Sequence, residues 1–137
     1  MTPASSPHRP RGITAQGIFF ALGAAISCTS FVALIFPGGP LEPMWRLNPR
    51  ARESFATMGG WSLALMAVVS LVCASASIGL WRVRRWGYLL ALALLTFSLL
   101  GDLANALSGL EPRAWVGVPV AGLMLAYLAT RRVRELF

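Results

Sequence analysis

Four long apolar stretches, separated by short polar segments that contain arginine, make up most of the chain. They cover residues 12–36, 55–81, 86–107 and, with its polar flanks, 112–131. A helix needs about 20 apolar residues to cross a hydrocarbon core of about 30 Å, because each residue adds about 1.5 Å. The pattern therefore predicts an all-α fold over residues 12–137, an integral membrane antiparallel four-helix bundle.

The polar segments between these stretches predict where the helices end. Asn48-Pro49 is typical of an N-cap followed by proline in the first helical position, so the second helix should begin there, outside the membrane. Glu111-Pro112 repeats this signal before the fourth helix, and Gly109 predicts the end of the third. Residues 44–47 of the first external loop favour a short turn that lies on the surface. The link over residues 82–85 is so short that the second and third helices should be antiparallel neighbours.

The first eleven residues differ in composition from the rest of the chain. Residues 1–11 are rich in proline and serine and contain the only histidine, His8, which predicts a disordered cytoplasmic tail. The apolar run that follows is too long for the core of a secretory signal. The residues after Cys28 stay apolar where a mature lipoprotein would become polar, so we expect the first helix to be retained.

All twelve basic residues are arginines, and the net charge is +7. In a four-span arrangement, one side of the membrane carries eight of them and the other side four. The positive-inside rule then places both termini in the cytoplasm of a bacterial inner membrane. The arginines flank spans and form no single basic face, so anionic lipid headgroups are the expected partner and nucleic acid is not. The expected headgroup contacts are Trp81, Arg82, Arg84, Arg85 and Trp86.

Small residues at helical spacing predict the faces on which the helices pack, because helices in lipid associate through close backbone approach. The third helix carries Gly87, Ala91 and Ser98 in such a pattern, and the fourth carries Gly117 and Ala121. These faces suit the core of a bundle, and a ligand passage between helices is the alternative.

Asp102 is the one charged residue inside the four stretches when the fourth is taken without its polar flanks, over residues 114–130. A carboxylate within a span is a functional hypothesis by default, because it costs at least about 2.5 kcal/mol at mid-bilayer. Asp102 precedes Leu107 by five residues, which places it about 7 Å below the outer boundary. Two interpretations stay open: a structural ion pair or cap near the outer surface, and a cation or proton site. Its possible partners are Asn105, Arg113, Arg52 and Arg50.

The sequence supplies no other set of residues for chemistry. Cys28 and Cys73 are expected to differ by roughly 13 Å in depth, too far for a disulfide. The spans hold no histidine, and no CxxC motif, catalytic triad, metal cluster or phosphate loop is present. We therefore expect no enzyme activity, no cofactor and no metal.

The segment Gly79-Leu80-Trp81-Arg82-Val83-Arg84-Arg85-Trp86-Gly87-Tyr88 is the most distinctive local pattern. It resembles a GLW-x-x-RRWG-aromatic turn found in uncharacterised small bacterial membrane proteins. The resemblance covers about ten residues; it implies a four-span layout and carries no activity.

Taken together, these features predict a non-enzymatic accessory or interaction subunit that binds copies of itself or another membrane protein. The alternative is a small transporter or channel that uses Asp102. Small multidrug exporters also have four spans, but they need a carboxylate deep in the first helix, and this chain has none there.

Overall fold

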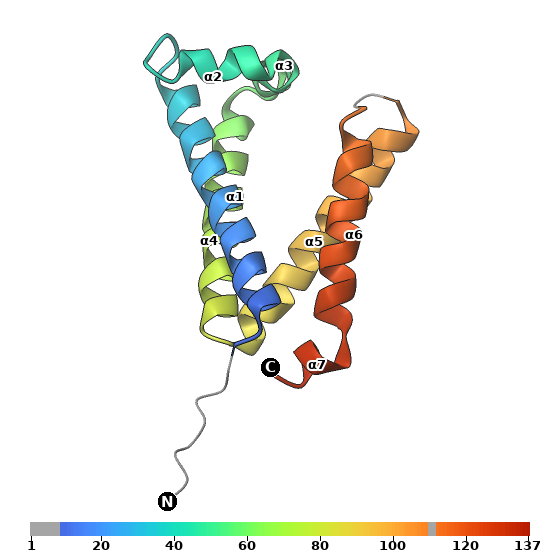
Figure 1. Ribbon diagram of the computed structural model, residues 1–137. Coiled ribbons are helices and arrows are strands. Elements are labelled where there is room, and N and C mark those ends of the chain that lie inside the picture. Colours follow the sequence, from blue (N-terminus) through green and yellow to red (C-terminus); the bar gives the residue numbers. More distant parts are fainter. Residues whose placement is uncertain (1–8, 110–111) are drawn as a thin grey trace, which may run out of the picture. The chain divides into compact units, whose positions relative to one another are not determined.

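The computed structural model describes residues 9–109 and 112–137, and it confirms the predicted all-α class. The described residues are 83% helical, and no strand occurs among them. The helices, labelled in Figure 1, are α1 (Arg11–Ile35), α2 (Glu42–Leu47), α3 (Pro49–Met58), α4 (Gly60–Trp81), α5 (Arg85–Leu107), α6 (Ala114–Ala129) and α7 (Arg131–Arg134).

Three helices are long and apolar enough to cross a membrane: α1, α4 and α5. At most 22% of the residues in any of their most apolar windows are buried within the protein, so most of their apolar surface faces outward. Water would penalise such a surface and hydrocarbon would not, which indicates a membrane protein. The fourth apolar helix, α6, has 16 residues.

The helix ends follow the local signals in the sequence. The Asn48 side chain accepts a hydrogen bond of 3.2 Å from the backbone N–H of Ala51, with Pro49 in the first helical position of α3, as predicted. Gly109 follows the last residues of α5 with φ of +68°, so it is the predicted glycine stop. The predicted turn over residues 44–47 is part of α2. Glu111 and residues 1–8 of the predicted tail lie outside the described residues, and Arg11 already belongs to α1.

The second predicted span is divided where a continuous helix was expected. α3 ends at Met58, Gly59 has φ of +60°, and α4 begins at Gly60. The N–H of Gly59 donates to the carbonyls of Phe55 and Ala56, which closes the last turn of α3. The break separates a polar helix that carries three charged side chains from a helix that carries none, so the two can lie in different surroundings.

The chain forms two compact units, and α1 and α4 contribute to both. The α2–α3 unit consists of residues 20–74. Within it the C-terminal part of α1 and the N-terminal part of α4 are held together by the Ser70 hydroxyl, which donates a 3.1 Å hydrogen bond to the carbonyl of Ala24. α2 and α3 connect these two helices, and the rings of Trp45 and Phe55 meet edge to face with centroids 5.7 Å apart.

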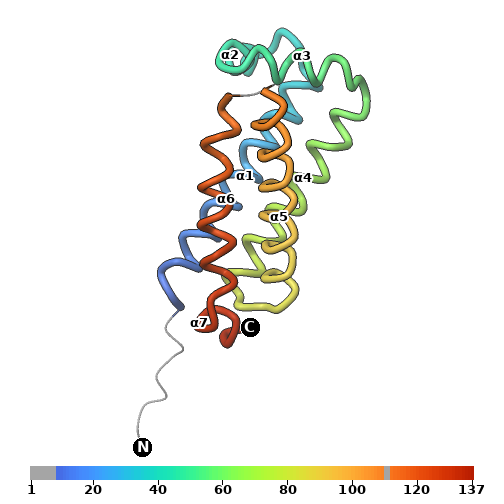
Figure 2. Tube along the Cα trace, turned by 90° about the vertical axis from the view of Figure 1, so that its right-hand side faces the viewer, coloured from blue at the N-terminus to red at the C-terminus, as the bar shows by residue number. Residues whose placement is uncertain are grey.

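The α5–α6 unit consists of the described residues among 1–19 and 75–137. α5 and α6 run side by side in opposite directions, and α7 follows α6 at the end where α5 begins (Figure 2). The first turns of α1 and the last turns of α4 complete this unit. Its interior is formed by apolar side chains that are almost fully buried, including Ile13, Leu80, Leu95, Leu128 and Val133.

Candidate functional site

The carboxylate of Asp102 lies at the contact between α5 and α6, directly against the backbone of Gly117. A Cβ atom at position 117 would overlap both Oδ2 and Cγ of Asp102. The glycine therefore provides the space that the half-buried carboxylate occupies. The sequence assigned these residues to two separate roles, an ionisable site and a packing face, and the structure brings them together.

Asn105, Arg113, Arg52 and Arg50 are the predicted polar partners of Asp102. Asn105 and Arg113 are exposed, and within residues 9–109 and 112–137 no hydrogen bond or ion pair engages the Asp102 carboxylate. Arg52, another predicted partner, instead forms an ion pair with Glu42. The two interpretations of Asp102 therefore both remain predictions.

The small residues predicted to mark packing faces have different surroundings. Gly87, Ala91 and Ala121 are buried, whereas Ser98 is exposed on α5. Gly87 lies against Gly79 of α4 so closely that a Cβ atom on either glycine would overlap the Cα atom of the other. We call the link over residues 82–85 the arginine turn. The close approach of the two helix backbones beside it depends on two glycines that are eight residues apart in the sequence.

Three side-chain hydrogen bonds join the four helices at the end of the α5–α6 unit where α1 begins. Gln16 of α1 donates to the carbonyl of Met124 in α6 at 3.0 Å, and Ser77 of α4 donates to the carbonyl of Gly17 at 2.7 Å. Tyr88 of α5 donates to the carbonyl of Leu128 in α6 at 2.9 Å. The acceptors of all three bonds are backbone carbonyls, which have no signature in a sequence.

The arginine turn is built around one residue with an unusual backbone. Val83 has φ of +52°, which a β-branched residue rarely adopts, and the N–H of Arg84 donates to the carbonyl of Gly79 at 2.9 Å. All five predicted headgroup contacts are exposed. The ring of Trp81 also lies against Gly17 of α1, where a Cβ atom would overlap the indole.

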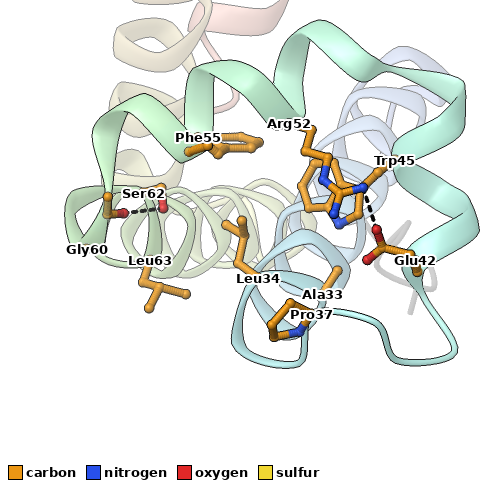
Figure 3. Close-up of a pocket in the computed structure, with 12 residues that line it drawn as sticks. Ala33, Leu34, Pro37, Glu42, Trp45, Arg52, Phe55, Gly60, Ser62 and Leu63 are labelled. Atoms are coloured by element: carbon orange, nitrogen blue, oxygen red, sulfur yellow. Dashed lines mark hydrogen bonds and ion pairs between the residues drawn. The ribbon is translucent and has the colours of Figure 1, made fainter.

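The α2–α3 unit contains a cavity of about 290 Å³ beneath α2 and α3 (Figure 3). Its wall is mainly apolar, with Leu34, Trp45 and Phe55 among its side chains. Glu42 is the carboxylate on this wall, and it is engaged twice, by Arg52 and by the N–H of Gly38 at 3.1 Å. This ion pair braces the loop after α1 and leaves no free base, so the cavity suits a small apolar group better than acid–base chemistry.

Within the described ranges, no three His, Cys, Asp or Glu side chains lie together so that they could hold a metal ion. No family model, curated protein or solved structure matches the chain. The resemblance of residues 79–88 to a turn in small bacterial membrane proteins therefore stays a prediction. Function has to be argued from the geometry.

Proposed function

We propose that this chain is a four-span protein of the bacterial inner membrane that acts as a non-enzymatic interaction subunit. The three long apolar helices support the membrane placement, and α6 supports a fourth span because it is apolar throughout and runs along α5.

The observation that carries this proposal is a polar face on α5 that the α5–α6 unit leaves open. Ser98, Gly101 and Asn105 follow one another at spacings of three and four, so they share one side of the helix. Ser98 and Asn105 are exposed, and a Cβ atom at Gly101 would meet nothing within 4 Å. Hydrocarbon tails cannot satisfy the hydroxyl and amide groups, whereas a helix packed over Gly101 can approach closely enough to bond with both.

Affinity purification in mild detergent, followed by mass spectrometry, tests this proposal when a variant on the α5 face is compared with the unchanged chain. A tagged chain should retain either a partner membrane protein or a second copy that carries a different tag. Gly101→Leu should abolish that retention. Val116→Leu is the matched control, because residue 116 is an exposed apolar position on α6. Recovery of the chain as a lone monomer, or equal behaviour of the two variants, would contradict the proposal.

A small transporter or channel is the second candidate, and one observation favours it. The Asp102 carboxylate has no bonded partner among the described residues and lies within an apolar helix, as a cation or proton site would require. In proteoliposomes, a transporter should give a proton or cation flux that Asp102→Asn abolishes and Val116→Leu, at an exposed apolar position, preserves. An interaction subunit should show no such flux and should tolerate Asp102→Asn.

A further inference from the structure

A second cavity lies in the α5–α6 unit, where the first turn of α5 meets α7. It has a volume of about 230 Å³ and is lined by Arg85, Tyr88, Leu89, Arg134 and Phe137. Figures 1 and 2 show how it arises: α6 ends, the chain turns through α7, and the last residues come back to the beginning of α5. The lining combines two guanidinium groups with two aromatic rings and an aliphatic side chain.

Hydrogen bonds and ring stacking hold the wall of this cavity in place. The Tyr88 hydroxyl is bonded to the carbonyl of Leu128, and the Tyr88 ring stacks on Phe137 with centroids 4.9 Å apart and planes inclined by 22°. The Nε of Arg85 donates to the backbone oxygen of Phe137. This bond orients Arg85 while leaving its two Nη groups without a partner among the described residues, and the Arg134 guanidinium likewise has none there.

Positive side chains outnumber negative ones in this region. No carboxylate side chain lines the cavity, and a neighbouring cavity of about 410 Å³ shares Arg134 and is lined otherwise by Arg131 and Glu135. Within the described ranges Glu135 makes no ion pair with either arginine. The beginning of α5 adds to this positive potential, because its N-cap residue supplies no side-chain hydrogen bond to the first amides.

We propose that the two cavities, which share Arg134 in their linings, bind the phosphate headgroup of an anionic membrane phospholipid. Arg85 and Arg134 are the phosphate ligands. Guanidinium groups bind phosphate oxygens through paired, charge-assisted hydrogen bonds. The apolar wall selects a lipid over a free phosphate ion, because Leu89 is 62% exposed and continues into the apolar stretch of α5, where an acyl chain can lie. The inference rests on the proposed membrane placement and adds a defined lipid site to it.

Native mass spectrometry of the full chain, released from nanodiscs that contain phosphatidylglycerol and phosphatidylcholine, tests this site. The wild type should retain phosphatidylglycerol selectively. Arg85→Gln/Arg134→Gln should lower that retention by about 100-fold, because each charge-assisted hydrogen bond to a phosphate oxygen contributes about tenfold. The control Arg9→Gln/Arg132→Gln removes the same charge from exposed positions outside both linings. Its retention should fall at least tenfold less than that of the double variant in the cavity.

Three outcomes would overturn the proposal. Equal losses in the two double variants would mean that only general attraction to the surface is at work. Displacement of the lipid by an excess of inorganic phosphate would make free phosphate the occupant. Leu89→Glu places a carboxylate beside the headgroup and leaves both arginines intact. If this variant still retained phosphatidylglycerol, the proposal would also be contradicted. The lipid site lies on α7 and the first turn of α5. Variants that remove it should therefore leave unchanged the retention of a partner protein on the face around Gly101, so the two proposals can fail separately.

Discussion

Gly79 and Gly87 set the distance between the backbones of α4 and α5 beside the arginine turn. Each glycine occupies the space where a Cβ atom on the other would lie, so neither position can accept a side chain without moving a helix. Gly122 on α6 provides a contrast, because a Cβ atom there would meet nothing within 4 Å. The same residue type therefore has a steric role at one position and none at another, and only the packed structure distinguishes them.

We expect Gly87→Ala to destabilise the protein by about 1–3 kcal/mol, because the added methyl group overlaps the backbone of Gly79 and Leu80. Gly122→Ala should be neutral or slightly stabilising, since alanine is favoured over glycine in a helix by about 1 kcal/mol. Thermal unfolding of both variants in the same mild detergent measures the difference. Similar melting temperatures for the two variants would argue against close packing at the arginine turn.

At the scale of elements, the corner between α3 and α4 is the largest departure from what the sequence predicted. The run from Phe55 to Trp81 is apolar throughout, so its composition indicates one helix. Gly59 interrupts it with a backbone conformation that residues with a Cβ atom rarely adopt. The interruption lets α3 carry its charged side chains away from the axis of α4.

Gly59→Ala should therefore destabilise the α2–α3 unit by roughly 1 kcal/mol, because alanine is strained at positive φ. Gly60→Ala is the matched control: residue 60 begins α4 with no positive φ, and a Cβ atom there meets no neighbour. Thermal unfolding, combined with cysteine accessibility at position 52 in an Arg52→Cys background, measures the loss of the corner. If the two alanine variants unfold alike, Gly59 has no special conformational role.

Sequence patterns predicted the elements better than the contacts between them. Asn48, Pro49 and Gly109 marked helix ends correctly because capping depends on residues within one turn. The ion pair between Glu42 and Arg52, and the contact of Asp102 with Gly117, depend on how separate helices come together. An apolar run indicates the length of a helix but not which helices it packs against, so neither contact can be predicted from a single sequence.

At the scale of the whole molecule, the length of α6 decides how the chain is threaded through the bilayer. Its 16 residues span about 24 Å, less than the hydrocarbon core of about 30 Å. Arg113 and Arg131 flank it, and long arginine side chains can reach the headgroups from positions slightly below them. α6 is also apolar along its whole length and packs along α5, which does have the length of a span.

We therefore expect α6 to span, which gives an even number of crossings and returns the C-terminal arginines to the side of Arg9 and Arg11. A reporter that is active only outside the cytoplasm should be active when fused after Gly109 and inactive when fused after Phe137. Activity at both positions would mean that α6 lies on the outer surface, and the eight-to-four distribution of arginines would then no longer describe the topology. The lipid site proposed at α7 requires the same crossing, since only a spanning α6 carries Arg134 to the membrane surface at which α5 begins.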